Sequence, residues 1–364
     1  YEITCRDWIS DVCSSDLVRP PGLASDRDDA IMHGLLFAIL ITGFVIEGAR
    51  MAVTELGSGT GLAAWSPVGL FVAGRISGLG EETLRSLHKG VWWVHFLLTL
   101  GFFVVLPRTK FRHILTTGAN YVFADRRRKG SIETLNLEDE QAEGYGVSKL
   151  RDLTWKDILD GDACTECKRC QDRCPAWNTE KPLTPMEVIA HIREVAFDCP
   201  DANLIETIGR DSLWACTTCR ACQEICPATI EHVNKIIDMR RHLVLMEGEF
   251  PGEEVTVATD NVEVNGNPLG LAFSARGDWA EGLGVSPLAE NADVDVLYFV
   301  GCYASFDKRN IKVARSFVRL CEAAGVRVGI LGKEEKCCGE PMRKLGTEYL
   351  YQGLAAENIE ILKG

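Results

Sequence analysis

Two runs of cysteine in this chain share one spacing. The first is Cys-Thr-Glu-Cys-Lys-Arg-Cys-Gln-Asp-Arg-Cys-Pro at 164–175, and the second is Cys-Thr-Thr-Cys-Arg-Ala-Cys-Gln-Glu-Ile-Cys-Pro at 216–227. Both follow C-x2-C-x2-C-x3-C-P, a spacing in which three thiolates of a tight loop bind one [4Fe-4S] cluster and the fourth reaches a neighbouring cluster. Two such clusters are therefore predicted, each with ligands from both runs.

The crosswise rule gives each cluster three cysteines of one run and the last cysteine of the other. The first cluster is assigned to Cys164, Cys167, Cys170 and Cys226. The second is assigned to Cys216, Cys219, Cys222 and Cys174. Structural zinc, which usually takes two C-x2-C pairs, and disulfides, which suit extracellular chains, are the alternatives; two complete copies of the pattern favour clusters.

A third group of cysteines lies near the end of the sequence. Apolar stretches at 294–301 and 326–331 have the length and composition of buried strands, with a helix predicted between them. Cys302 follows the first strand, and Cys337 and Cys338 follow the second. Parallel strands joined by a right-handed crossover end at one edge of a sheet, so the three thiols are expected to meet there. Adjacent cysteines fit an ordinary cubane poorly, which leaves another kind of cluster or a structural pair of buried cysteines.

The pattern of Cys302 followed by Cys337-Cys338-Gly339 resembles the cysteine-rich (CCG) domain of heterodisulfide reductase catalytic subunits. In that family a further C-x-x-C completes a noncubane iron–sulfur cluster, whereas this sequence reaches Gly364 before such a pair. The resemblance therefore implies a catalytic site at Cys302, Cys337 and Cys338 that this chain holds only in part.

Composition limits the classes of function. The 364 residues are 46% hydrophobic, which suffices for several domains and a membrane part, and the net charge of −13 argues against nucleic acid as a partner. Of the 15 cysteines, most stand in cluster-like spacings. Thiols kept for metal indicate a reducing compartment, so the iron–sulfur part is expected in the cytoplasm.

Two apolar segments, about 30–52 and 86–113, are predicted to cross a membrane, and buried helices of a soluble protein are the alternative. Basic residues follow the second segment at 108–112 and 126–129, whereas the loop between the segments has few. By the positive-inside rule the C-terminal side faces the cytoplasm. The protein is therefore expected to be a multi-pass protein of the cell membrane, with its iron–sulfur domain on the cytoplasmic side.

Histidines in the second segment suggest a further cofactor. His95 and His113 are eighteen residues apart, so on one helix they would share a face about 27 Å apart along the axis. With Pro107 between them, the segment resembles the last helix of the gamma subunit of respiratory nitrate reductases, which implies axial ligation of haem b. The second axial ligands would lie upstream of this sequence; His88 and His33 are weaker candidates.

The fold class expected is multidomain: a transmembrane helical fragment, an α-helical ferredoxin with two [4Fe-4S] clusters, and the start of an α/β CCG domain. Residues 1–17 resemble a translated sequencing adapter and are expected to carry no function, with the natural chain extending beyond both ends. The further boundaries are 18–124 for the membrane domain, 125–150 for a linker, 151–246 for the ferredoxin, 247–293 for a connector with a hairpin, and 294–364 for the truncated CCG domain.

Helices are predicted to separate the two cysteine runs. Residues 185–197 form one, and this helical spacer resembles the ferredoxins of fumarate reductase iron–sulfur subunits. A second helix follows Pro227, and its basic face, with Lys235 and Arg240, is expected to be solvated, with docking of a partner as the alternative.

From residue 18 onward the chain resembles membrane-fused iron–sulfur oxidoreductases that take electrons from electron-transfer flavoprotein and reduce menaquinone. The resemblance implies a flavoprotein donor, the membrane and menaquinone as partners, with two [4Fe-4S] clusters, haem b and a noncubane cluster as cofactors. The alternatives are an iron–sulfur subunit of heterodisulfide reductase or of glycolate or lactate oxidase, and, from another class, a non-catalytic electron-carrier module.

Overall fold

The structure is a computed structural model that describes residues 27–56, 62–127, 130–291 and 293–363. The predicted adapter-derived segment 1–17 lies outside the described residues. Two compact units are present. The first contains residues up to Val122 together with Asp162–Glu166, and the second contains Phe123–Gly161 and everything from Cys167 onward.

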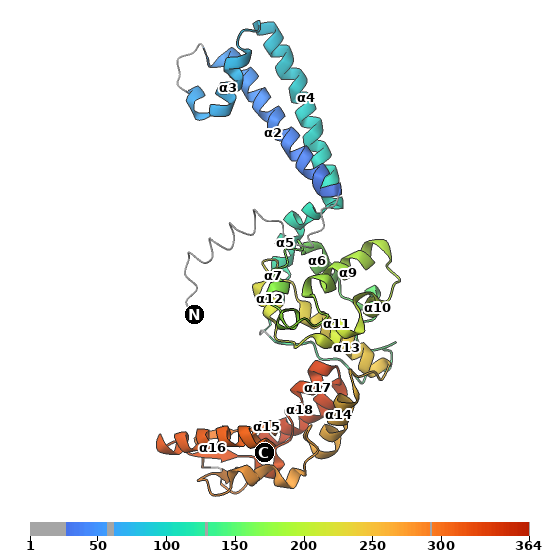
Figure 1. The fold of residues 1–364 in the computed structure, drawn as a ribbon, viewed down its shortest axis with the longest axis vertical. Coiled ribbons are helices and arrows are strands. Elements are labelled where there is room, and N and C mark those ends of the chain that lie inside the picture. The colour runs from blue at the N-terminus through green and yellow to red at the C-terminus, as the bar shows by residue number, and fades with distance from the viewer. Residues whose placement is uncertain (1–26, 57–61, 128–129, 292, 364) are drawn as a thin grey trace. The chain divides into compact units, whose positions relative to one another are not determined.

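The first unit is a pair of long helices with short helices attached (Figure 1). Its elements are α2 (Arg27–Thr54), η1 (Leu62–Trp65), α3 (Pro67–Ile76), α4 (Glu81–Val105), η2 (Leu106–Arg108), η3 (Lys110–Arg112) and α5 (His113–Val122). Helix α2 packs against both α3 and α4. Gly48 permits the close approach of α3, because a Cβ there would lie 2.5 Å from Cγ1 of Val72.

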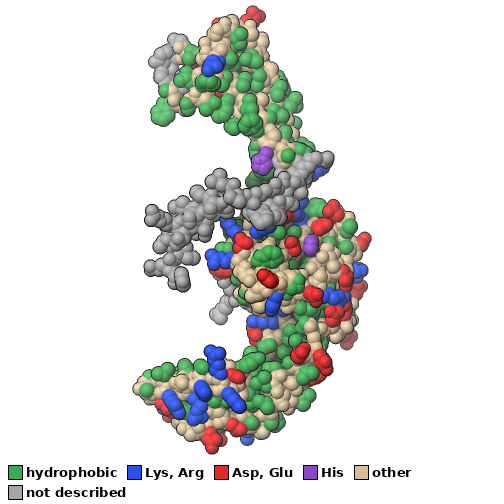
Figure 2. Space-filling model, in the orientation of Figure 1, with side chains coloured by type: hydrophobic (Ala, Val, Ile, Leu, Met, Phe, Trp, Pro, Cys, Tyr) green, Lys and Arg blue, Asp and Glu red, His purple; other side chains and the backbone are tan. Residues whose placement is uncertain are grey.

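Apolar side chains cover the outside of α2 and α4, and Figure 2 shows them over this unit. The stretches Ala30–Thr54 and Glu81–Arg108 have mean hydropathies of 2.0 and 1.8, and each is long and apolar enough to cross a membrane. Only 6% of either apolar window is buried inside the protein. By length and composition, the two helices are therefore candidate membrane spans.

The second long helix ends earlier than the sequence predicts. A single helix through His113 was expected, but α4 ends at Val105 and two short 3-10 turns follow. Pro107 lacks an N–H and cannot continue the helical ladder, and Thr109 is fully extended. His113 begins the separate helix α5, so the prediction that His95 and His113 share one helix face is wrong.

The second unit begins with a helical domain that contains both cysteine runs. Its elements are η4 (Leu150–Asp152), α6 (Trp155–Ala163), α7 (Arg169–Asp172), α8 (Pro175–Asn178), α9 (Pro185–Asp198), α10 (Leu204–Ile208), α11 (Arg210–Ala215), α12 (Ala221–Ile225) and α13 (His232–Met246). The predicted helices between and after the runs, α9 and α13, are confirmed. Their apolar faces meet in one core with Leu204, Leu213 and Leu243.

The basic face of α13 differs from the prediction of a solvated surface, which is wrong. Four polar side chains of this helix are buried, namely His232, Lys235, Arg240 and Arg241. Lys235 is paired with Asp160 and, at 2.9 Å, with Asp157. Acidic side chains and backbone carbonyls from distant parts of the chain supply the hydrogen bonds that make this burial tolerable.

The remaining elements form an α/β domain. They are α14 (Glu253–Asn265), η5 (Phe273–Ala280), β1 (Ser286–Pro287), β2 (Val296–Tyr298), α15 (Gly301–Phe306), α16 (Lys308–Ala323), β3 (Val328–Ile330), η6 (Gly332–Glu334), α17 (Glu340–Leu345) and α18 (Glu348–Lys363). The sheet order is β1-β3-β2, with both pairings parallel and Leu297 opposite Gly329. The predicted βαβ unit is confirmed, with shorter strands than expected.

Residues 247–293 contain α14 and β1, so the predicted hairpin is wrong. Strand β1 joins β3 in parallel, and a two-residue strand gives too short a periodic signal to be found from sequence. This segment thus contributes to the α/β domain.

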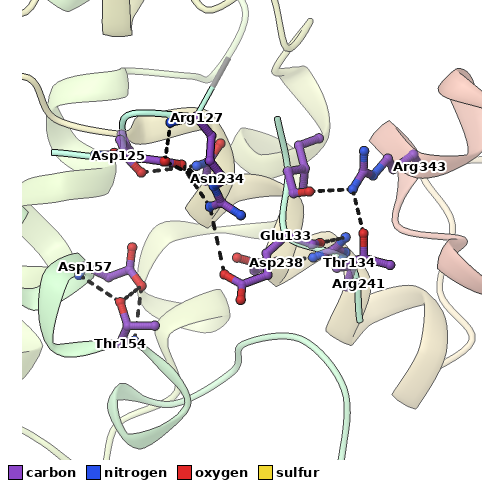
Figure 3. A network of polar contacts seen from close by, with 12 residues as sticks. Asp125, Arg127, Glu133, Thr134, Thr154, Asp157, Asn234, Asp238, Arg241 and Arg343 are labelled. Atoms are coloured by element: carbon purple, nitrogen blue, oxygen red, sulfur yellow. Dashed lines mark hydrogen bonds and ion pairs between the residues drawn. The ribbon is translucent and has the colours of Figure 1, made fainter. Parts of the chain in front are cut away.

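The segment predicted as a linker, 125–150, is held along the second unit. Its carbonyls accept hydrogen bonds from two helices: Arg241 of α13 donates to Glu133, and Arg343 of α17 donates to Ile132 (Figure 3). Val147 is buried in the core of the helical domain, and its N–H bonds the carbonyl of Asp238. The segment therefore touches both domains of this unit.

Candidate iron–sulfur centres

Four cysteines of the two runs surround one cavity. Cys216, Cys219 and Cys222 come from the loop before and the first turn of α12, and Cys174 comes from the residue before α8. The cavity itself is small, and the space between protein atoms there is about 310 Å³ only when the part open to solvent is included. This set is the one that the crosswise rule assigns to the second cluster, so Cys174 lies with the other run rather than closing its own.

The two cysteine loops adopt the same unusual backbone conformation. Glu166 and Lys168 in the first run have φ of 54° and 64°, and Thr218 and Arg220 at the matching positions have φ of 55° and 63°. A non-glycine residue in this left-handed region costs roughly 1–2 kcal/mol. This left-handed backbone curves each loop around its cysteine sulfurs. In the second loop the backbone N–H of Thr218 lies 3.4 Å from Sγ of Cys216.

The last cysteine of the second run lies with the first run. Burial raises the pKa of the Cys226 thiol, and the proximity of Cys167 raises it further. Cys164 is buried in the segment 162–166. The third cysteines of the two runs, Cys170 and Cys222, belong to one buried apolar cluster, so the two candidate sites share a wall.

The donors around the second cavity fit an iron–sulfur cubane. Burial raises the pKa of Cys216, and it raises that of Cys222 to about 12, so a cation must displace the protons before these sulfurs act as thiolate ligands. The cysteines of the described part are free thiols. Within the described ranges, no three His, Cys, Asp or Glu side chains converge on a single metal ion. The spread of four sulfurs around a cavity suits a group of several irons and sulfides, which when bound supplies one-electron redox chemistry.

The structure also brings together Cys302, Cys337 and Cys338. Cys302 lies in the first turn of α15, and the other two lie between η6 and α17. The thiol of Cys337 is hydrogen-bonded with both of the other sulfurs. The two loops leave β2 and β3 at the same edge of the sheet, where parallel strands place their ligands.

A buried ion pair that sequence reasoning missed supports this third site. The guanidinium of Arg276 is 2.8 Å from Oε1 of Glu335 and 3.5 Å from Sγ of Cys302. Glu335 also accepts the N–H groups of Val300 and Gly301 at 2.9 and 2.8 Å. The pair therefore fixes the turn that presents Cys302. Arg276 stands in a stretch without periodicity, so no sequence signal marked it.

Hydrogen bonding divides the charge among the three thiols. A hydrogen bond from Cys337, with the nearby Arg276 cation, lowers the pKa of Cys302 to about 7. A hydrogen bond from Cys337 lowers the pKa of Cys338 to about 6, and Cys337 as the shared donor has its pKa raised. Near neutral pH the outer two sulfurs thus have the anionic character that metal ligands need.

The candidate haem histidines occupy separate places in the first unit. Nδ1 of His95 is 2.8 Å from Oγ1 of Thr42 on α2, and its ring lies against Gly43. His113 begins α5, with its ring centroid 6.2 Å from that of Phe111. The continuous stripe expected from their spacing is absent from this described part of the chain.

Comparison with protein families matches both cysteine-bearing regions. Residues 163–230 match the family described as "4Fe-4S dicluster domain", and residues 296–364 match the family described as "Cysteine-rich domain" (CCG). The first range contains the eight cysteines of the two runs, and the second contains the three of the α/β site. The chain carries an iron–sulfur dicluster domain and a CCG domain.

Several curated proteins are similar to this dicluster–CCG chain. An EtfAB:quinone oxidoreductase of Syntrophomonas wolfei is 36% identical over 368 residues, covering 90% of this chain and 51% of that protein. A "probable iron-sulfur-binding oxidoreductase" of Bacillus subtilis is 33% identical, covering 86% and 52%. A "probable membrane-anchored ferredoxin" of Chromohalobacter salexigens is 36% identical, covering 66% and 40%. The chain thus spans about half the length of the first two relatives. No solved structure matches.

Proposed function

We propose that this chain is part of a membrane-bound iron–sulfur oxidoreductase that transfers electrons between a flavoprotein, electron-transfer flavoprotein in the first instance, and menaquinone. The observation that carries the proposal is the cavity formed by Cys174 with Cys216, Cys219 and Cys222, because it joins two cysteine runs in one redox site. Similarity to an EtfAB:quinone oxidoreductase supports the choice of donor and acceptor.

In this proposal the chain's own residues hold and shield the redox groups. The eight cysteines of the two runs bind two [4Fe-4S] clusters crosswise, and Cys302, Cys337 and Cys338 hold part of a noncubane cluster at the catalytic site. The apolar wall shared by Cys170 and Cys222, with Met186, Val233 and Ile237, excludes water between the two cubane sites. Exclusion of water keeps the reorganisation that accompanies each electron small.

The membrane part is proposed to anchor the protein in the cell membrane, with the iron–sulfur domains on the cytoplasmic side. Helices α2 and α4 support this anchoring by length and apolarity. Haem b is proposed at His95 and at His113 as independently placed axial ligands. The bond of Nδ1 of His95 to Thr42 supports this role, because it orients the ring and leaves Nε2 available.

The similarity to a membrane-anchored ferredoxin favours a second candidate, a non-catalytic electron carrier. Both candidates require the two cubanes, but only the oxidoreductase requires the CCG cysteines. Cys302→Ser therefore separates them.

The test uses the full-length protein in membranes, with reduced electron-transfer flavoprotein as donor and a menaquinone analogue as acceptor. The oxidoreductase proposal expects quinone reduction that Cys302→Ser abolishes while the two cubane signals persist. Cys199→Ser, an exposed cysteine outside all three sites, is the matched control and should retain activity. Quinone reduction that is unaffected by Cys302→Ser would contradict the catalytic role, and absence of any reduction by the intact protein would contradict the donor and acceptor.

A further inference from the structure

A buried arginine without a counter-charge stands behind the second cubane site. Arg240 of α13 is only 4% exposed. Its guanidinium donates to the backbone carbonyls of Leu213 (2.6 and 3.0 Å), Trp214 (3.3 Å), Cys216 (2.6 Å) and Lys344 (3.0 Å). Its hydrogen bonds thus go to neutral groups, and its guanidinium lies over the ring of Trp214, 5.2 Å from the ring centroid.

The neighbouring cations of α13, unlike Arg240, form ion pairs with carboxylates. Arg241 is 2.7 Å from the buried carboxylate of Glu348 and 2.8 Å from Asp238, which Figure 3 shows beside it. Lys235 is paired with two aspartates. For Arg240, by contrast, no carboxylate of the described ranges lies within ion-pair distance, and it bonds the backbone carbonyl of Cys216 at 2.6 Å.

A buried cation that lacks an anion is strongly unfavourable, so the position of Arg240 points to an anion beside it. The adjoining cavity is lined by Cys216 and three further cysteines. A cubane bound by four thiolates is anionic overall, and an added electron makes it more so. The ligand set of the second site therefore supplies the missing counter-charge.

Arg220 is a second arginine at these sites: it lines the second cavity with Cys219 and Cys222, and it lines another pocket with Cys226. Its guanidinium donates to Gln223 and Asn234, both at 3.1 Å. Asp160 is the carboxylate whose negative charge acts on the thiol of Cys226. That carboxylate is itself fully buried and neutralised by Lys235 and Lys156. Arg240 differs from Arg220 in its place, because its guanidinium bonds the backbone carbonyl of the ligand residue Cys216 at 2.6 Å.

We infer that Arg240 raises the reduction potential of the second cubane. A fixed cation beside a redox group favours its more negative, reduced state, and net charge and hydrogen bonding are among the factors that set cluster potentials. This inference rests on the crosswise ligation in the proposed function, and it does not depend on the identity of the donor or acceptor.

The experiment is a redox titration of both clusters by electron paramagnetic resonance in the full-length protein. Arg240→Gln keeps an amide donor near the same carbonyls and removes the charge. At a fixed potential we expect the oxidised-to-reduced ratio of the second cluster to rise about tenfold, a downward shift of about 59 mV for one electron, with the first cluster unchanged. Arg240→Lys, which keeps the charge, should retain most of the native potential.

Two comparisons keep the inference falsifiable. Arg241→Gln alters the next residue of the same helix and should not shift the second cluster selectively. If Arg240→Gln does not bind iron, Arg240→Lys decides, because a variant that keeps the charge should bind iron at the second site near the native potential, and Cys174→Ser identifies that signal. Failure of Arg240→Lys to do so, equal shifts of both clusters, or the same shift in Arg240→Lys as in Arg240→Gln would overturn the inference. Absence of both cubane signals from the native protein would instead contradict the proposed cluster ligation.

Discussion

The two cysteine runs have the same spacing and a left-handed backbone at the same two positions of the loop. The charged side chains that lie near the two runs differ. The first site adjoins the neutralised group of Asp160 and Lys235, whereas the second adjoins Arg240, which has no carboxylate partner within the described residues and lies over the ring of Trp214. Local sequence thus determines which group each loop can bind. Distant residues of α13 and α6 determine the electrostatic setting of that group.

The largest expected effect tests which run completes which site. Cys174→Ser removes one of the four cysteines around the second cavity, so it should destroy or convert the second cluster and leave the first. Iron content and paramagnetic resonance of the full-length protein measure this. Loss of the first cluster alone would break the crosswise assignment, and Cys199→Ser serves as the unaffected control.

Removing the cation of the first site should cost stability rather than potential. Lys235→Met removes the buried cation that pairs with the buried carboxylate of Asp160 while Lys156 stays in place, and we expect a loss of about 3–5 kcal/mol in the free energy of unfolding. Lys156→Met is the matched control, because it leaves the buried Lys235–Asp160 pair intact. Urea unfolding followed by circular dichroism measures the free energy of unfolding of both variants. Equal losses would show that the buried Lys235–Asp160 pair contributes no more than the Lys156–Asp160 pair.

Acid should weaken the surroundings of the first site before those of the second. Burial, reinforced by Lys235, lowers the pKa of His232 to about 4, so the unfolded chain binds the extra proton first as pH falls. Stability that is complete above about pH 6.5 should then decline by roughly 3 kcal/mol down to pH 4. His232→Gln should flatten this part of the profile of unfolding free energy against pH. An unchanged slope would assign the acid sensitivity to other groups.

The smallest effect concerns the contact between α13 and α17 on the side of the second site. Gly346 has φ of 101°, and a Cβ there would lie 2.7 Å from backbone atoms of Arg240. Gly346→Ala should destabilise by about 1–3 kcal/mol, through the left-handed conformation and the clash together. Gly209→Ala shares the positive φ, with 3.8 Å to the nearest atom, and should cost less in thermal unfolding. Similar losses in the two variants would remove the clash as a cause.

Features set by residues close together in sequence could be predicted, whereas contacts between residues far apart in sequence could not. The cysteine spacing and the two parallel strands depend on neighbours along the chain, and both were found. The burial of Arg240 and the pair of Arg276 with Glu335 join residues far apart, so no periodicity marks them. The end of α4 was missed for another reason: Pro107 was taken to lie within a helix, which its missing N–H and the extended Thr109 prevent.

The segment near Ile132 and Leu135 has a consequence for the order in which the protein is made. The carbonyl of Ile132 accepts from Arg343, and that of Leu135 accepts from Gln352, 211 and 217 residues later in the chain. During synthesis these carbonyls stay hydrated until α17 and α18 have left the ribosome. Contacts between residues so far apart in sequence form late. The helical domain can therefore fold first, and the α/β domain then packs against the segment near Ile132 and Leu135.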